Sequence, residues 1–422
     1  MGIIESGAVW AWSSGPLYQS PQPMAIEGVP WLRWASWFAV FFGLFPLIMA
    51  YFVWGERKAA ARFQDRIGPN RVGPFGLLQS IADAVKLLTK ENIVPGSADS
   101  VIHLLAPVLL LVSAFTMLAV IPFGVGLAAV NPPSGLLFLV AITGLSPLSI
   151  FLAGWSSRNK FSLLGAMRAV AQLVSYEVPQ VLATVPVVLW AGSLSLVTIF
   201  DRQVDAGWFV FSPPGLLAFG ILTIANIAEV NRAPFDLPEA ESEIVAGYHT
   251  EYSGMRFALF FLAEYLGIFG VSCLGIALFL GGGTLPFVGG WQVRLFGTDT
   301  WSGFVFTNLG VVSVFSVKVL AYVFVIFWIR ATVPRLRVDR LMDFAWKTLV
   351  PLALFNIATA AVWFELAVRP EVPRPILAWL VTGPMVLGSI LAVAAIHRAT
   401  ARPNDPLVPN PVPSPRLLEL RH

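Results

Sequence analysis

The feature that most constrains this chain is a series of long apolar runs. Nine runs approach the ~20 residues that a helix needs to cross a bilayer, and they lie at about 34–54, 103–123, 136–154, 174–192, 214–230, 256–280, 307–329, 347–367 and 376–397. Only 12% of the 422 residues are charged, against about 25% in a soluble domain. A soluble enzyme, a nucleic-acid-binding domain and a disordered chain are therefore excluded, and an all-α, polytopic membrane helix bundle is expected.

Cysteine and histidine are scarce, which limits the redox chemistry that the chain can carry itself. Its one cysteine, Cys273, lies in an apolar run, so disulfides and cysteine-ligated clusters are excluded. Of the four histidines, only His103 and His397 lie near apolar runs, each at an end. We expect no metal or haem in this chain, so any transferred electrons belong to a partner.

The basic residues predict how the chain crosses the membrane. If the first run begins outside, 21 Lys and Arg residues fall on the inside and five on the outside, while Lys318 lies within a run. Such an excess predicts that the N-terminus is outside and the C-terminus is in the cytoplasm. Residues 1–30 contain no Lys or Arg, so no signal peptide is expected. No internal repeat is visible, which disfavours a transporter built from inverted repeats.

The first inside loop combines basic residues with an amphipathic pattern. Leu78, Ile81, Val85 and Leu88 are spaced three and four apart, which predicts a helix at the interface or against a partner. Basic residues precede it around two Gly-Pro turns, namely Arg57, Lys58, Arg62, Arg66 and Arg71. Contact with anionic lipid headgroups would explain the basic charges but not the two Gly-Pro turns. The turns indicate a fixed backbone path.

The third inside loop is acidic, against the general trend. Six of the 24 acids fall within 23 residues, with one base among them: Glu229, Asp236, Glu239, Glu241, Glu243 and Glu251, with Arg232. The cluster is either a solvated acidic loop or a group of crowded carboxylates that exchange protons. Its position on the inside face favours the functional interpretation.

Three further ionisable residues fall inside apolar runs. They are Glu177, Glu264 and Lys318. Ionisable groups within a membrane are costly and commonly mark ion or proton paths. The structural alternative is a buried pair, such as Glu264 with Lys318.

Three stretches of this sequence resemble one protein family. They are ERK followed by RIGPNRVGPFGLLQSIADAVKLLTKE, then AEVNRAPFDLPEAESEIVAGYHTEYSGMRFALFFLAEY, and finally WIRATVPRLRVDRLMDFAWKTLVPL. Together they resemble the membrane-embedded H subunit of bacterial NADH:quinone oxidoreductase, called subunit 1 in mitochondrial complex I. The match runs in order from about 35 to 365. The longer N-terminal segment, the ninth run and the Pro-rich tail resemble longer actinobacterial members.

The resemblance implies a component of a redox-driven proton pump. In that family the H subunit joins a hydrophilic arm, which carries flavin and iron–sulfur clusters, to the membrane arm that pumps protons. Quinone is the substrate, and the chain itself binds no cofactor. The implied quinone-chamber residues are Arg57, Arg66, Asp83 and Arg232. The implied acidic coupling path is Glu177, Glu229, Asp236, Glu239, Glu241, Glu243 and Glu264. Lys318 is a further candidate for this path, because it lies within an apolar run.

We expect three parts in the chain: an outside segment (1–33), a core quinone-chamber domain (34–367), and an extra membrane helix with an inside tail (368–422). Two other functions stay open at this point. The related membrane component of energy-converting hydrogenases lacks NADH and quinone, although the basic loop and its GPN turn favour the quinone type. A stand-alone secondary transporter is disfavoured by the large charged loops. An actinobacterial origin would favour menaquinone over ubiquinone.

Overall fold

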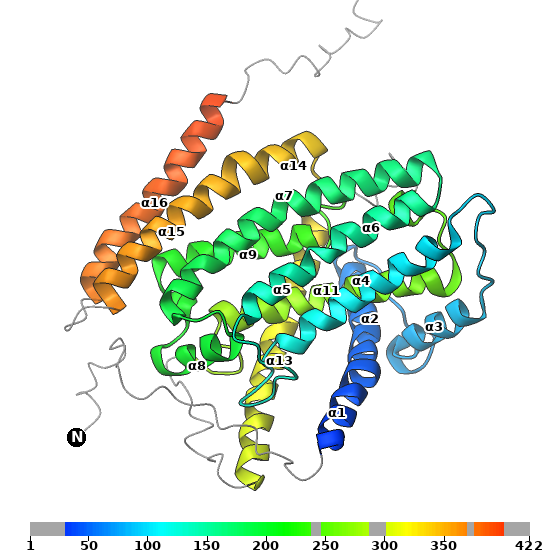
Figure 1. Ribbon diagram of the computed structural model, residues 1–422, viewed down its shortest axis with the longest axis horizontal. Helices are drawn as coiled ribbons and strands as arrows, with labels where there is room; N and C mark the ends of the chain where they lie inside the picture. Colours follow the sequence, from blue (N-terminus) through cyan, green and yellow to red (C-terminus); the bar gives the residue numbers. More distant parts are fainter. Residues whose placement is uncertain (1–29, 238–245, 287–300, 369–374, 401–422) are drawn as a thin grey trace, which may run out of the picture.

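The computed structural model describes residues 30–237, 246–286, 301–368 and 375–400. All regular elements in these ranges are helical, which confirms the all-α prediction (Figure 1). The α-helices are α1 (Pro30–Ala39), α2 (Phe45–Phe63), α3 (Gln79–Thr89), α4 (Ser100–Val120), α5 (Gly135–Thr143), α6 (Leu145–Ser156), α7 (Lys160–Ala191), α8 (Leu196–Ala206), α9 (Pro213–Glu229), α11 (Gly254–Phe279), α13 (Trp301–Thr332), α14 (Val338–Phe344), α15 (Val350–Trp363) and α16 (Pro375–Thr400).

Short helical segments join several of these helices. Three are π-helical and continue an adjoining α-helix: η1 (Val40–Leu44), η5 (Ala345–Leu349) and η6 (Phe364–Val368). Three others are 3-10 turns: η2 (Pro74–Gly76), η3 (Phe209–Phe211) and η4 (Gly247–His249).

Eight helices in the described residues are long and apolar enough to cross a membrane. They correspond to eight of the nine predicted runs and cover Ala35–Phe63, Ser100–Val120, Gly135–Ser156, Lys160–Ala191, Gly254–Phe279, Ser302–Thr332, Val338–Ala367 and Ile376–Ala395. The remaining run forms α9, which has 17 residues. At 1.5 Å per residue α9 is about 26 Å long, slightly shorter than the ~30 Å hydrocarbon core. The run itself, at about 214–230, is also 17 residues long.

The longest central helix, α7, has clear local signals at both ends. The side chain of Asn159 caps its first turn by accepting from the backbone N–H of Phe161. Gly192 ends the helix with a φ of +65°, a left-handed conformation that glycine adopts without strain. Pro179 and Pro186 lie inside α7, as proline does in many membrane helices.

The helices form one bundle in which α7 is central. It packs against α6, α9 and α15, while α4 packs against α6 and α11. At one side of the bundle α2 contacts α3, α11 and α13. At the opposite side α16 lies along α15 and also contacts α9 (Figure 1). The continuous core runs from Phe45 of α2 to Ala378 of α16, so the ninth apolar run is built into the fold.

The predicted amphipathic helix of the first inside loop is present as α3. Its four apolar side chains, Leu78, Ile81, Val85 and Leu88, are all exposed in the isolated chain. A stripe of this kind needs an apolar surface to cover it, as expected for a helix at the membrane interface or against a partner protein.

Candidate functional site

A buried carboxylate near the end of α2 is the centre of a charged cluster. Glu56 is 6% exposed and forms an ion pair with Arg330 of α13. The phenol of Tyr265, from α11, donates a hydrogen bond of 2.5 Å to Oε2 of Glu56. Arg232 Nη1 lies 3.9 Å from Oε1 of Glu56. Because burial of an unpaired charge is expensive, these partners are what allows Glu56 to remain inside the bundle.

Arg232 connects Glu56 to a second carboxylate. Its Nη2 lies 3.8 Å from Oε2 of Glu264, and its guanidinium carbon lies 4.7 Å from the centre of the Tyr265 ring. The Tyr248 hydroxyl donates to Oε1 of Glu264 at 2.8 Å. One cation is thus shared by two buried acids, so a change of charge on either acid alters the field at the other.

The segment after α9 adds a third carboxylate beside this cluster. Asp236 is 9% exposed and accepts a hydrogen bond of 2.9 Å from Nη2 of Arg335. Asp236 also lies within electrostatic reach of Glu264. The backbone N–H of Leu336 donates to the carbonyl of Pro234, which fixes the two segments against each other.

A small cavity separates Glu264 from the next acid. Both Glu264 and Glu229 line it, and its volume is about 60 Å³. One water needs about 10–15 Å³ of such volume together with polar partners. Further polar groups in the wall are Ser113, Thr143, Ser146, Asn231 and Tyr248. The cavity therefore has the size and the polar lining to hold waters between the two carboxylates.

Beyond the cavity the acids continue along α7. The side-chain amide of Gln180 donates to Glu229 and, at 3.2 Å, to Asn226. Glu177, one helical turn before Gln180, lies within electrostatic reach of Glu229. A Cβ placed on Gly144 would come within 3.3 Å of Oε1 of Glu177, so this carboxylate lies against the junction of α5 and α6. Asp236, Glu264, Glu229 and Glu177 thus form a row through the bundle, which we call the carboxylate row.

The turn that carries Tyr248 is held by aromatic and polar contacts. Tyr252 stacks on His103, with ring centres 3.8 Å apart, and its hydroxyl lies 3.3 Å from that of Ser156. Burial raises the pKa of Tyr252 to about 12, so the phenol stays protonated at neutral pH. Arg256 Nη1 donates to Nδ1 of His103 at 2.7 Å. These contacts fix the segment after η4 against α4, α6 and the first turn of α11, while η4 itself packs against α6 and α7.

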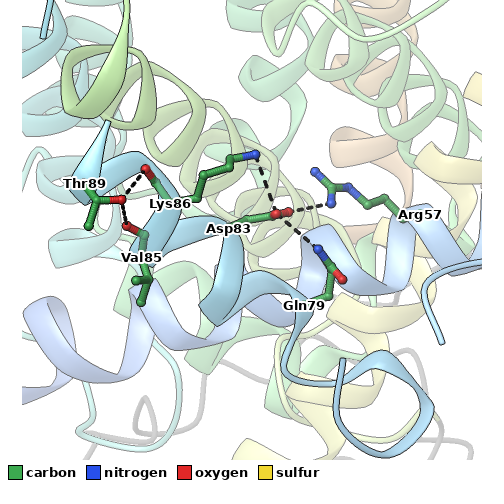
Figure 2. A network of polar contacts seen from close by, with 6 residues as sticks. All are labelled: Arg57, Gln79, Asp83, Val85, Lys86 and Thr89. Carbon is green, nitrogen blue, oxygen red and sulfur yellow. Dashed lines mark hydrogen bonds and ion pairs between the residues drawn. The ribbon is translucent and has the colours of Figure 1, made fainter. Parts of the chain in front are cut away.

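A separate charged pair joins α3 to α2 at the surface. Figure 2 shows Asp83 of α3 between Arg57 of α2 and its own neighbours Gln79 and Lys86. The distance from Arg57 Nη1 to Asp83 Oδ2 is 2.7 Å. Arg66 lies in the exposed loop between the two helices and donates to Gln64. Arg57 and Asp83 are therefore brought together, whereas Arg66 forms no hydrogen bond or ion pair with either of them in the part of the chain that the structure describes.

Lys318 does not join the carboxylate row. Its ammonium donates to the backbone carbonyls of Leu280, Gly282 and Thr284 at 2.6, 2.7 and 2.6 Å. It also lies 4.0 Å from the centre of the Trp208 ring. The alternative of a Glu264–Lys318 pair is wrong, because Glu264 interacts with Arg232 and Tyr248, while three carbonyls use all three ammonium protons.

The site and the predicted residues do not coincide completely. Glu239, Glu241 and Glu243 lie outside the described residues. The role of Glu56 was missed because the first apolar run ends at residue 54, whereas α2 continues to Phe63. Its basic partner Arg330 lies about 270 residues later, at the end of another apolar run, and nothing in the sequence pairs the two residues. No group of three His, Cys, Asp or Glu side chains in the described ranges is arranged to hold a metal.

The comparison with protein families agrees with this architecture. The profile described as "NADH dehydrogenase" matches residues 36–361 of the chain. A protein of Geobacillus kaustophilus, named as the H subunit of NADH-quinone oxidoreductase, is 47% identical over 350 residues, which cover 80% of this chain and 98% of that protein. The chain belongs to the NADH-quinone oxidoreductase H-subunit family.

Other members of the H-subunit family match to a similar extent. The Dehalococcoides mccartyi (strain CBDB1) protein is 44% identical over 347 residues, or 82% of this chain and 91% of that protein. The Brevibacillus brevis protein is 48% identical over 314 residues, or 74% of this chain and 88% of that protein. Both are named as the H subunit of NADH-quinone oxidoreductase. Membership confirms the resemblance and makes this chain a multi-pass membrane component of an oxidoreductase.

Proposed function

We propose that this chain forms the quinone-binding chamber of NADH:quinone oxidoreductase and the start of its proton-coupling path. The observation that carries the proposal is Arg232, which lies between the buried acids Glu56 and Glu264. From Glu264 the cavity and the carboxylate row lead away through the bundle. A charge created beside Arg232 would therefore act first on acids that are connected to the membrane interior.

The mechanism begins with the charge of the reduced quinone. Reduction places negative charge on the headgroup, and each added electron is matched by a proton. Arg232 would stabilise this charge from inside the bundle, while Arg57 would act from the exposed side of α2 and Arg66 from the loop that follows it. Two unit charges about 8 Å apart interact by roughly 2 kcal/mol at an effective dielectric constant of 20. This energy is large enough to redistribute protons among neighbouring acids, because a tenfold change in an equilibrium needs about 1.4 kcal/mol.

The row gives such a redistribution a direction. When the Arg232 guanidinium interacts with the negatively charged quinone headgroup, its interaction with Glu264 becomes weaker. Glu264 then loses stabilisation of its negative charge and gains affinity for a proton. Waters in the cavity would carry a proton between Glu264 and Glu229, and Gln180 would hold Glu229 in position beside Glu177. We include Glu239, Glu241 and Glu243 in the path on the resemblance alone.

The proposal also includes the surroundings of the chain. In this proposal the charged surface formed by Arg57 of α2 and Asp83 of α3 faces the hydrophilic-arm proteins that carry the flavin and iron–sulfur clusters. Other helices contact the membrane-arm proteins. We propose the plasma membrane of a bacterium, with the N-terminus outside and the C-terminus cytoplasmic. Residues 34–367 form the chamber domain, 1–33 an outside segment and 368–422 an added membrane helix with its tail. Menaquinone stays a prediction.

The test uses the whole complex purified gently from membranes. We expect the chain to co-purify with flavin and iron–sulfur proteins. Glu229→Gln and Glu177→Gln should each lower NADH–quinone turnover by about tenfold, equivalent to roughly 1.4 kcal/mol of barrier. Transfer from NADH to a soluble acceptor that reacts before quinone should stay unchanged in the same preparations. A chain that purifies without redox partners, or normal quinone reduction and proton pumping in both variants, would overturn the proposal.

A further inference from the structure

An apolar groove lies between α2 and α13, and Glu56 is not among the residues that line it. Its volume is about 440 Å³. The walls include Tyr51, Phe52, Gly55 and Ala59 from α2 with Phe324 and Phe327 from α13. Tyr51 is 41% exposed and Phe324 is 50% exposed, so the groove opens to the outside of the bundle. Both helices belong to segments that are long and apolar enough to span a membrane, so in a bilayer this opening would face hydrocarbon rather than water.

A cation lies beyond one end of the groove, on the same face of α2. Arg62 follows Gly55 by seven residues and Ala59 by three, and this spacing places the three residues on one side of a helix. The Arg62 side chain is exposed and makes no hydrogen bond or ion pair with any residue that the structure describes. Its basic neighbours are engaged, since Arg57 pairs with Asp83 and Lys58 donates to the carbonyls of Pro69 and Phe75.

We propose that the groove binds one acyl chain of an anionic phospholipid, with the headgroup phosphate on Arg62. The apolar walls match a hydrocarbon chain, and a basic residue at the membrane surface attracts an anionic headgroup. Gly55 leaves the space for the chain, because a Cβ placed there would meet no atom within 4 Å. The occupant is thus defined by an apolar chain at one end and a negative charge at the other.

The bound chain would have a consequence for the charged cluster. Phe327 lines the groove, and Arg330, which pairs with Glu56, follows one turn later on α13. A lipid between α2 and α13 therefore fills space beside the two helices that position this ion pair. The complex should retain this lipid more strongly than the exchangeable lipids around it.

The experiment measures phospholipid retained by the purified complex. Wild-type and variant complexes are reconstituted with phosphatidylcholine containing a minor share of phosphatidylglycerol, washed with detergent, and analysed by mass spectrometry. Gly55→Leu should fill the groove and Arg62→Gln should remove the cation. Each should lower the retention of one phosphatidylglycerol per complex by about fivefold. The matched controls are Leu104→Phe, at an exposed site on α4, and Arg71→Gln, in the exposed loop after α2. Both should retain the wild-type amount.

Two results would overturn the proposal. One is equal phosphatidylglycerol retention in the groove variants and their controls. The other is a density map of the wild-type complex in which a partner helix or a quinone tail fills the groove. Because the readout is lipid retention, a failure here is distinguishable from a failure of the proposed quinone chemistry.

Discussion

Two basic residues inside the bundle are stabilised in opposite ways. Arg232 lies among ionisable groups, within 4 Å of Glu56 and Glu264 and over the ring of Tyr265. Lys318 contacts no carboxylate among the described residues. Its ammonium is surrounded instead by three backbone carbonyls and an indole ring.

The difference indicates which region can change state. The Leu280 carbonyl caps the C-terminus of α11, where a helix carries partial negative charge, and the Gly282 and Thr284 carbonyls follow it. Backbone carbonyls neither ionise nor exchange protons. Lys318 therefore holds α13 against the C-terminal end of α11 and the segment after it, through contacts whose acceptor groups do not change with protonation. Carboxylates can gain or lose a proton, so the charges on Glu56 and Glu264 beside Arg232 can change. We infer that the Lys318 contact provides stability and the Arg232 cluster provides chemistry.

The largest expected effect comes from removing the shared cation. Arg232→Met leaves Glu264 without its ion-pair partner, and breaking a buried pair in this way costs about 3–5 kcal/mol. We expect little assembled complex in membranes and loss of NADH–quinone turnover, measured by native gel and by oxygen-independent quinone reduction.

The matched control for this variant is Arg232→Lys, which keeps the charge but loses the planar guanidinium. It should restore assembly while turnover stays several-fold below wild type. Normal turnover in Arg232→Met would mean that the cluster has no part in the chemistry.

A smaller and different effect is expected at Lys318. Lys318→Met removes three hydrogen bonds and leaves buried carbonyls unsatisfied, at about 1–3 kcal/mol for such a group. The assembled complex should lose activity several degrees below the wild-type inactivation temperature. Turnover per assembled complex in the cold should stay unchanged.

Lys318→Arg serves as the comparison, since it keeps the positive charge and several donors. Its inactivation temperature should lie between those of wild type and Lys318→Met. If Lys318→Met instead lowered turnover with unchanged thermal stability, Lys318 would belong to the coupling path, as its position in an apolar run first suggested.

The smallest effect is expected at the exposed pair of Figure 2. Asp83→Asn weakens the contact with Arg57, and exposed ion pairs contribute only about 0.2–1 kcal/mol. We expect unchanged thermal stability and about a twofold higher KM for a short-chain quinone, an increase that fades as salt screens the pair. An effect as large as that of Arg232→Met would remove the distinction between buried and exposed charges.

The amino-acid sequence by itself determined the class of the protein and the location of its charged segments. The length and spacing of the apolar runs predict the helices, because a bilayer imposes a minimum length and full backbone hydrogen bonding. Eight of nine runs became long apolar helices, and the short run formed α9. The spacing of Leu78, Ile81, Val85 and Leu88 likewise predicted α3. These features depend on local sequence, so they can be read without knowing the neighbours.

Only the tertiary structure decided which charges are partners. Arg232 meets Glu56, about 180 residues earlier, and Arg330 reaches the same carboxylate from another helix. Lys318 and Glu264 look alike in the sequence, as charges within apolar runs, yet one is held by carbonyls and the other by an arginine and a tyrosine. Helical periodicity gives the face on which a side chain lies, but the neighbour on that face depends on how the helices pack.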